Sequence, residues 1–440
     1  MAEQLIRLRD PVHGFIHLSQ KELRLVESAP FRRLRNIKQL ALTCLVYPGA
    51  MHTRFEHSLG VMELATRAFD ALMKKFDTEL KRNFSRLHMS AEEARELLRV
   101  TALLHDIGHL PFSHGGEDVL PLKHDGKRTS HEEVSIAVIR NTPMSEILDR
   151  DYNPEMAEHV CLLLDENREV PPELLILKKL ISGQFDADKM DYLARDSLHC
   201  GVGYGNFDYL RLLETIRVKD AEEGGLELSI ERGGVHTLEA MVLARYWMFT
   251  QVYFHKTRRI YDKYLSHYLR AWYSGQYDDL LGVLNQDDLS LMAEMRSDDR
   301  PNPDNPERQR WARRILNRQH HRVVYETSDH ALPDDEKTAL KVEKALKERY
   351  PGIEFICDLD ARGSVHKFYV KGVDEEMGEE FPVYDNVSHR YSRLSEESRI
   401  FEKVPKRFRV IRIYADVPKD SLNDYRSFAR DEARRFREAI

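Results

Sequence analysis

Hydrophobic residues recur at helical spacing through most of the first two-thirds of the chain. Between Ala91 and Leu104 the apolar residues lie three and four positions apart, and Ser90 with Glu93 forms a capping box directly before them. Val61–Met73 has the same amphipathic pattern. Further helices are predicted at residues 130–140, 173–181 and about 237–272. The pattern therefore predicts a mainly α-helical protein.

The pattern changes near residue 300. Residues 297–306 (SDDRPNPDNP) contain three prolines and indicate a loop or linker. Beyond it, β-patterned segments occur at 323–325, 353–357, 367–370 and 409–415, and helical patterns at 335–350 and from about 421. We therefore predict a helical domain over residues 1–300 and a small α+β module over residues 301–440.

Composition narrows the class of protein. Hydrophobic residues make up 42% of the chain and charged residues 32%, as in ordinary globular proteins. No apolar run approaches the roughly 18 residues that a membrane span needs, and the N-terminus has no signal-peptide core. The four cysteines are scattered, which argues against a disulfide framework or a zinc knuckle. A cytoplasmic protein is therefore expected, and the net charge of −7 argues against a nucleic-acid-coating role.

Histidine and aspartate supply the candidate chemistry. His105 and Asp106 are adjacent at the end of an apolar helix, where an imidazole and a carboxylate can reach one divalent cation. His57 lies just before an amphipathic helix upstream, and Asp188 follows an apolar helix downstream. Mixed imidazole and carboxylate ligands suit Mn, Fe, Zn, Ni or Mg and leave room for water and a phosphate oxygen. An adjacent His-Asp pair alone is weak evidence, so the order of all four residues decides.

The order H…HD…D resembles the HD superfamily of phosphohydrolases. The similarity extends to longer motifs, which occur as DPVHG at 10–14, FRRLRNIKQL at 31–40, YPGA at 47–50, RFEHSLG at 54–60, HDIGHLPFSH at 105–114 and DKMDYLARD at 188–196. These motifs resemble the deoxynucleoside triphosphate triphosphohydrolase branch, over roughly residues 5–265. Since no SAM domain precedes the motifs, we expect a closer match to the bacterial proteins of this branch. The resemblance implies an HD-domain helical bundle with metal ligands His57, His105, Asp106 and Asp188.

The resemblance also implies proton-transfer residues. His109, His131 and Glu132 would lie around the nucleophilic water, and His114 would be the acid for the leaving group. Displacement at phosphorus needs an activated water and a proton for the departing alkoxide, so the chemistry agrees with such a set. For Glu132, in the first turn of a predicted helix, a helix-dipole role is the alternative. His52, His124 and His199 are interpreted as structural.

Substrate-binding residues are expected on the same motifs. Arg54 and Lys189 suit triphosphate oxygens, because guanidinium and ammonium groups bind phosphate. By resemblance, Tyr192 and Asp196 would meet phosphate and sugar, and Gln39 and Leu40 would enclose the deoxyribose. Packing on a long helix is the alternative for the last two candidates of this group, which are Arg245 and Tyr253.

The implied reaction is hydrolysis of a dNTP to a deoxynucleoside and triphosphate by a homo-oligomer, expected to be a tetramer. In activated relatives, an Asp and a Gln–Arg pair bind a guanine nucleotide activator. The matching positions in this chain are Glu27, Arg32 and Arg35, so another nucleotide activator, or none, is expected. One alternative is a different HD phosphohydrolase, a nucleotidase or phosphodiesterase, which Arg54, Lys189, Tyr192 and Arg245 disfavour. A single-stranded nucleic-acid binder is the other, disfavoured by the acidic balance and the lack of a basic stripe with interleaved aromatics.

Overall fold

The computed structural model describes residues 5–120, 123, 126, 128–273, 282–300, 305–368 and 380–438. The chain forms two compact units, each assembled from several stretches of sequence. The first unit comprises residues 1–244, 275–291 and 367–403, and the second comprises 245–274, 292–366 and 404–440. The predicted domain boundary at residue 300 stays a prediction. No described helix is long and apolar enough to cross a membrane.

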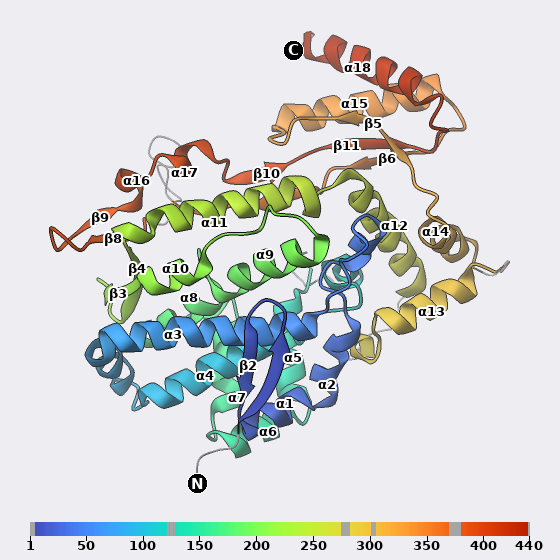
Figure 1. Ribbon diagram of the computed structural model, residues 1–440. Helices are drawn as coiled ribbons and strands as arrows, with labels where there is room; N and C mark the ends of the chain where they lie inside the picture. The colour runs from blue at the N-terminus through green and yellow to red at the C-terminus, as the bar shows by residue number, and fades with distance from the viewer. Residues whose placement is uncertain are drawn as a thin grey trace. The chain divides into compact units, whose positions relative to one another are not determined.

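Long amphipathic helices form the centre of the first unit. Helix α3 (Arg54–Ser85) contains the predicted segment Val61–Met73 and packs against α4 (Ala91–Leu104) and α9 (Ala187–Cys200) (Figure 1). The capping box at Ser90 is present, as predicted. This arrangement places the start of α3, the end of α4 and the start of α9 in one unit, and these are the positions of the candidate ligands.

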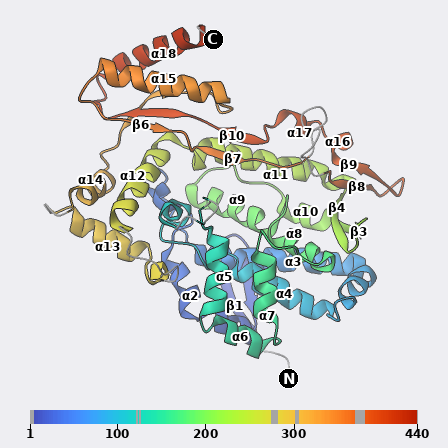
Figure 2. The ribbon, with the colours of Figure 1, turned by 180° about the vertical axis from the view of Figure 1, so that it is seen from behind.

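Shorter helices surround this centre. α5 packs against α7, which also packs against α4 (Figure 2). The other helices of the unit are α1 (Gln20–Val26), α2 (Ala29–Arg32), η1 (Arg33–Asn36), η2 (Ala41–Leu45), η3 (Ser113–Val119), α5 (His131–Asn141), α6 (Met144–Asp151), α7 (Met156–Leu164), α8 (Pro172–Ile181), α10 (Tyr209–Thr215), η4 (Arg232–Gly234), α16 (Leu394–Glu397) and α17 (Ile400–Lys403). The helices predicted at 130–140 and 173–181 are therefore present.

The first unit also contains strands that the sequence analysis did not predict. An N-terminal antiparallel hairpin pairs β1 (Ile6–Asp10) with β2 (Gly14–Leu18). A four-stranded sheet has the order β3-β4-β8-β9, in which the β4–β8 pair is parallel. Its strands are β3 (Ile216–Asp220), β4 (Leu226–Glu231), β8 (Pro382–Asp385) and β9 (Arg390–Arg393). The sequence analysis predicted helices for this region and named none of these six strands.

The long helix predicted over about 237–272 is interrupted. α11 (Val235–Met248) is followed by a π-helical turn, η5 (Phe249–Tyr253), before α12 (Lys256–Tyr273) begins. The rings of Phe249 and Phe254 stack with centroids 5.4 Å apart across this turn. A π-helical turn of this kind is a rare single-turn feature inside helices, so the sequence pattern alone gave no reason to expect it.

The second unit is built on a small antiparallel sheet with strand order β5-β11-β6. α15 (Pro333–Arg349) and α18 (Leu422–Glu438) lie on one face of it (Figure 1) and share a core with residues such as Val342, Leu346 and Ile413. The strands are β5 (Arg322–Glu326), β11 (Arg412–Ala415) and β6 (Phe355–Asp358). A second pair joins β7 (Arg362–Ser364) to β10 (Arg407–Arg409) (Figure 2). α14 (Pro306–Leu316) also belongs to this unit, and α13 (Asp288–Asp298) begins in the first unit and ends in the second.

The prediction of a mainly α-helical protein with a small α+β C-terminal region is confirmed. The strand predicted at 409–415 is two strands, because β10 and β11 pair with different partners. Of the strand predicted at 367–370, residues 369–370 lie outside the described residues. The predicted loop at 297–306 begins inside α13, and its residues 301–304 are not described.

Candidate metal centre

Three helices of the first unit bring the four predicted ligands together. His57 lies in the first turn of α3, which begins at a capping box formed by Thr53 and Glu56. His105 caps the end of α4, and Asp106 follows it. Asp188 lies in the first turn of α9. The arrangement therefore depends on two helix starts and one helix end.

The ligand atoms converge within a few ångströms. Nε2 of His57 is 3.1 Å from a carboxylate oxygen of Asp188 and 3.5 Å from one of Asp106. Nε2 of His105 is 3.3 Å from Asp106 and 4.0 Å from Asp188. Atoms that bind one ion at about 2.0–2.2 Å are separated by about 3–4 Å, so this spacing fits a single divalent cation.

The hydrogen bonding of the two histidines tests whether a metal fits. Nδ1 of His57 pairs with Asp191 at 2.7 Å, and Nδ1 of His105 pairs with the Ala102 carbonyl at 2.7 Å. If each Nδ1 carries the proton, each Nε2 presents a lone pair to the centre. Both Nε2 atoms are buried and have no hydrogen-bond partner among the described residues. A buried acceptor without a donor is costly, so the residues fit a bound cation.

The charge of the pocket also favours a cation. Burial lowers the pKa of His57, but the carboxylates of Asp188, Asp191 and Asp106 outweigh it and raise the pKa to about 10. Burial would raise the pKa of Asp106, but the Arg54 guanidinium and neighbouring imidazoles hold it well below its usual range. A positive charge is therefore stabilised at the centre, whether a proton or a metal ion supplies it.

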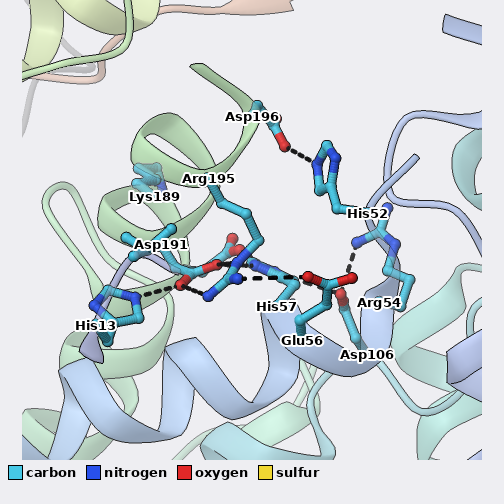
Figure 3. A network of polar contacts seen from close by, with 12 residues as sticks. His13, His52, Arg54, Glu56, His57, Asp106, Lys189, Asp191, Arg195 and Asp196 are labelled. Atoms are coloured by element: carbon cyan, nitrogen blue, oxygen red, sulfur yellow. Dashed lines mark hydrogen bonds and ion pairs between the residues drawn. The ribbon is translucent and has the colours of Figure 1, made fainter. Parts of the chain in front are cut away.

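Asp191 is a supporting residue to which the sequence analysis assigned no role. Its carboxylate binds His57, accepts two hydrogen bonds from Arg195 at 2.8 Å each, and pairs with Nε2 of His13 at 2.6 Å (Figure 3). Gly60 leaves room for this group, since a Cβ there would lie 1.9 Å from an Asp191 oxygen. Asp191 therefore fixes the tautomer and orientation of a candidate metal ligand.

Asp191→Asn is expected to weaken metal binding by about 10–100-fold, because an outer-shell carboxylate sets the basicity and orientation of its histidine. The measurement is metal affinity by competition with a chelator. Asp70→Asn is the matched control, because Asp70 pairs with Arg95 at the surface of α3 and α4. Equal affinity in the Asp191 variant and the wild type would contradict this supporting role.

A second cluster contains the four predicted proton-transfer residues. The rings of His109 and His131 stack with centroids 4.0 Å apart, and the His114 ring lies 4.9 Å from His109. Nε2 of His131 is 3.2 Å from Glu132. The sequence analysis did not single out Glu117. One oxygen of its carboxylate pairs with Nδ1 of His114 and with Nδ1 of His131, at 2.8 Å each. The cluster therefore forms a continuous polar chain.

Electrostatics distinguish the members of this cluster. Burial, with the positive charge of Arg54, lowers the pKa of His109 well below its usual value. The carboxylates beside His131 outweigh its burial and raise its pKa, and the two imidazoles hold the pKa of Glu117 well below its usual range despite burial. The cluster therefore combines a neutral histidine with a histidine–carboxylate pair, which is an arrangement suited to proton transfer.

The predicted sugar-binding residues are linked to each other through His52, which had been interpreted as structural. Its carbonyl accepts the Gln39 amide hydrogen at 3.0 Å, and its Nε2 pairs with Asp196 at 2.7 Å (Figure 3). Leu40 is buried beside Gln39 and precedes η2. The ring of His199 stacks on His52 with centroids 4.5 Å apart.

The predicted phosphate ligands are engaged with carboxylates. Arg54 donates to Asp106 at 2.6 Å, and Lys189 donates to Asp186 at 2.5 Å. Tyr192 is half-buried on α9, one turn after Asp188. The roles of these residues in substrate binding stay predictions.

The structure does not test the remaining predicted positions. Arg245 and Tyr253 belong to the second compact unit, so their predicted roles are not tested. Glu27, Arg32 and Arg35 are exposed. His124 lies outside the described residues.

Comparison with known proteins agrees with this site. Residues 54–196 match the HD domain family model, and residues 207–354 match the HD associated region. An uncharacterized protein of Methanocaldococcus jannaschii is 36% identical over 289 residues, which are 66% of this chain and 54% of that protein. Chicken deoxynucleoside triphosphate triphosphohydrolase SAMHD1 is 34% identical over 235 residues, which are 48% of this chain and 36% of that protein. The chain thus spans about half the length, or less, of these relatives.

A solved structure extends the similarity to nearly the whole chain. A hypothetical protein from Aquifex aeolicus has a TM-score of 0.75 and 31% sequence identity, covering 97% of this chain and 100% of that chain. The candidate ligands His57, His105, Asp106 and Asp188 all lie inside residues 54–196, which the HD model matches. The chain therefore belongs to the HD-domain proteins, with an HD associated region after its HD domain.

Proposed function

We propose that the chain hydrolyses deoxynucleoside triphosphates to a deoxynucleoside and inorganic triphosphate in a metal-dependent reaction. The observation that carries the proposal is the convergence of two unpartnered imidazole nitrogens with two carboxylates, beside a separate proton-transfer cluster. A divalent ion held by His57, His105, Asp106 and Asp188 would supply polarisation of a phosphoryl oxygen and a water of lowered pKa. The similarity to SAMHD1 proteins supports the substrate class.

The residues of the second cluster would act at the two ends of the reaction. The water oxygen bonds to the α-phosphorus as the bond from phosphorus to the 5′-oxygen breaks. The water gives its proton to Glu132, which lies 3.2 Å from Nε2 of His131, and His114 gives its Nε2 proton to the departing 5′-oxygen. Because Glu117 holds Nδ1 of His114, Nε2 is the nitrogen left for a substrate, and it donates when the imidazole carries a proton on both nitrogens.

The test is incubation of metal-loaded protein with each dNTP, singly and mixed, followed by anion-exchange separation of the products. Intact triphosphate and a deoxynucleoside are expected, and a chelator should abolish both. Orthophosphate or pyrophosphate as the primary product would contradict the proposal. An Asp106→Asn variant controls for contaminating phosphatases, because it changes one candidate ligand and retains an acceptor for Arg54.

A nucleotidase acting on monophosphates is the second candidate, and one observation favours it. Arg54 and Lys189, the groups proposed for a triphosphate, are both paired with carboxylates within the chain. A monophosphate would require fewer cationic partners. Faster hydrolysis of a dNMP than of the corresponding dNTP would support this candidate over the main proposal.

Sugar discrimination tests the role of Leu40. A pocket closed around C2′ leaves a ribose hydroxyl desolvated and unpaired, at a cost of about 1–3 kcal/mol, or roughly 10–100-fold in rate. Wild-type protein should therefore prefer dATP to ATP, and Leu40→Gly should reduce the ratio of the two kcat/KM values. Leu45→Gly, the same change at the end of η2, is the control and should leave the ratio unchanged.

Equal hydrolysis of ATP and dATP by the wild type would contradict the deoxynucleotide assignment and leave only the family assignment. An unchanged ratio in Leu40→Gly would remove Leu40 from the sugar pocket. Assembly into a homotetramer and activation by a nucleotide stay predictions of the resemblance.

A further inference from the structure

The segment 286–288, which ends at the first residue of α13, binds two loops that are distant in sequence. Asp288 is 2% exposed. One of its carboxylate oxygens accepts the Phe112 amide hydrogen at 2.6 Å, and the other accepts the Lys38 amide hydrogen at 3.0 Å. All three residues belong to the first compact unit. One buried carboxylate therefore joins the loop after the His-Asp pair to the segment before α3.

The first of these loops has an unusual backbone. Phe112 and Ser113 are consecutive non-glycine residues with φ of 61° and 55°, in the left-handed region that such residues rarely adopt. This turn lies between His109 and His114, so its conformation determines how those two imidazoles are placed. A turn of this kind persists only when surrounding groups hold it, and the Asp288 oxygen bonds directly to the first of its amides.

The second loop carries the predicted sugar-binding residues. Lys38 directly precedes Gln39, and its carbonyl accepts a hydrogen bond from the Ser113 hydroxyl at 2.6 Å. The same hydroxyl accepts a hydrogen bond from Nε of Arg54 at 3.0 Å. The two loops are thus bonded to each other as well as to Asp288, and a shift in either would be transmitted to the other.

Arg33 reinforces the same junction. Its guanidinium donates to the carbonyls of His109 at 2.5 Å, Ile107 at 3.3 Å and Gln286 at 3.2 Å. Burial lowers the pKa of Arg33 to about 10, although the charges of Asp287 and Asp288 oppose this. The segment therefore holds the loop after the His-Asp pair at two points, through Arg33 and through Asp288.

We propose that Asp288 is a positioning residue that fixes the turn between His109 and His114 relative to the segment carrying Gln39. This inference rests on the proposed function of those residues. A carboxylate is required because two amide hydrogens approach two different oxygens, whereas the amide group of asparagine has one acceptor. Burial raises the pKa of Asp288 to about 6, against the lowering effect of the two amide bonds.

The test compares Asp288→Asn with Asp287→Asn. The Asp287 carboxylate accepts hydrogen bonds from the side-chain amide of Asn36 at 2.8 Å and from the backbone amide of Ser290 at 2.9 Å. The control therefore makes the same chemical change at the neighbouring residue. In Asp288→Asn, kcat should fall by about 10–100-fold, because small displacements of catalytic groups have effects of that order. Metal content should stay within about threefold, because the metal ligands are untouched, and the change in KM should be smaller than the fall in kcat, because the turn places proton-transfer residues.

Hydrogen exchange gives a readout that does not depend on the substrate. The amides of Lys38 and Phe112 should exchange at least about tenfold faster in Asp288→Asn than in the wild type, because each amide bonds to this carboxylate. Asp287→Asn should exchange like the wild type at both positions. If Asp288→Asn fails to fold, Asp288→Glu keeps the charge while moving both oxygens and should show the same loss of kcat.

Several results would overturn the inference. These are an unchanged kcat in Asp288→Asn, an equal loss of kcat in Asp287→Asn, or unchanged exchange of both amides. If the wild type hydrolyses no dNTP, the proposed function fails, and the exchange measurement together with kcat on whichever phosphate ester is hydrolysed still tests Asp288. The two failures are therefore distinguishable.

Discussion

Replacing both His105 and Asp106 with alanine should remove bound metal and lower hydrolysis by at least about 1,000-fold, while the helical fold survives. Both side chains belong to the candidate metal centre, and the remaining pair of His57 and Asp188 offers only two ligands. Loss of the ion would remove both activation of water and charge stabilisation at phosphorus. Metal content by elemental analysis and kcat/KM are the measurements, with circular dichroism to check the fold.

The control for this variant is the double change His17→Ala and Asp70→Ala, because both residues are exposed in the same compact unit. Asp106→Ala also leaves the buried Arg54 without its carboxylate partner, and the loss of one member of a buried ion pair destabilises folded proteins by about 3–5 kcal/mol. Asp106→Asn avoids that loss by keeping an acceptor. Full metal content in the folded double-alanine variant would rule out the ligand assignment.

His114→Asn should lower kcat by about 100–10,000-fold, the range that general acid catalysis commonly contributes, with little effect on KM. Glu117→Gln should lower kcat less, because it removes only the group that orients His114 and His131. The loss of kcat in His114→Asn should be small for a nitrophenyl triphosphate ester, because nitrophenolate leaves without a proton. The measurement is kcat on both substrates.

The chain contains a matched control for this pair. His236 binds Glu239 at 2.8 Å with the same spacing of three residues, but His236 is 88% exposed, and the pair lies outside the cluster. His236→Asn should therefore leave kcat unchanged on both substrates. If His114→Asn slows the nitrophenyl ester as strongly as the dNTP, His114 does not protonate the leaving group.

The candidate metal centre could be predicted from sequence because each ligand lies at a recognisable helix terminus. His57 follows a capping residue, the His105-Asp106 pair ends an apolar helix, and Asp188 begins another. The four residues were then connected by their order in a known motif. In the structure, Nε2 of each histidine lies within 4.0 Å of a carboxylate oxygen of Asp106 and of Asp188.

Supporting residues were harder to identify, for physical reasons that differ. Asp191 and Glu117 each lie three residues after a predicted site residue, so helical spacing is a signal that could have found them. Asp288 has no such signal, because its partners lie 176 and 250 residues away and are backbone amides. Only the tertiary structure brings them together.

The helices and strands that the sequence analysis missed also differ in whether they leave a local sequence signal. Ile6 and Leu8 alternate with Arg7 and Arg9, which is a strand pattern, but a five-residue segment gives it little weight against the helical pattern that follows. The π-helical turn at Phe249–Tyr253 leaves the apolar pattern intact and gives no local signal. Short strands and single-turn irregularities therefore account for most of the differences in the first two-thirds.

The most direct test of the central claim is hydrolysis of a dNTP in water enriched in oxygen-18, followed by mass spectrometry of both products. Attack of water on the α-phosphorus predicts one labelled oxygen in the released triphosphate and none in the deoxynucleoside. Label in orthophosphate or pyrophosphate, or in the 5′-hydroxyl of the deoxynucleoside, would contradict the account.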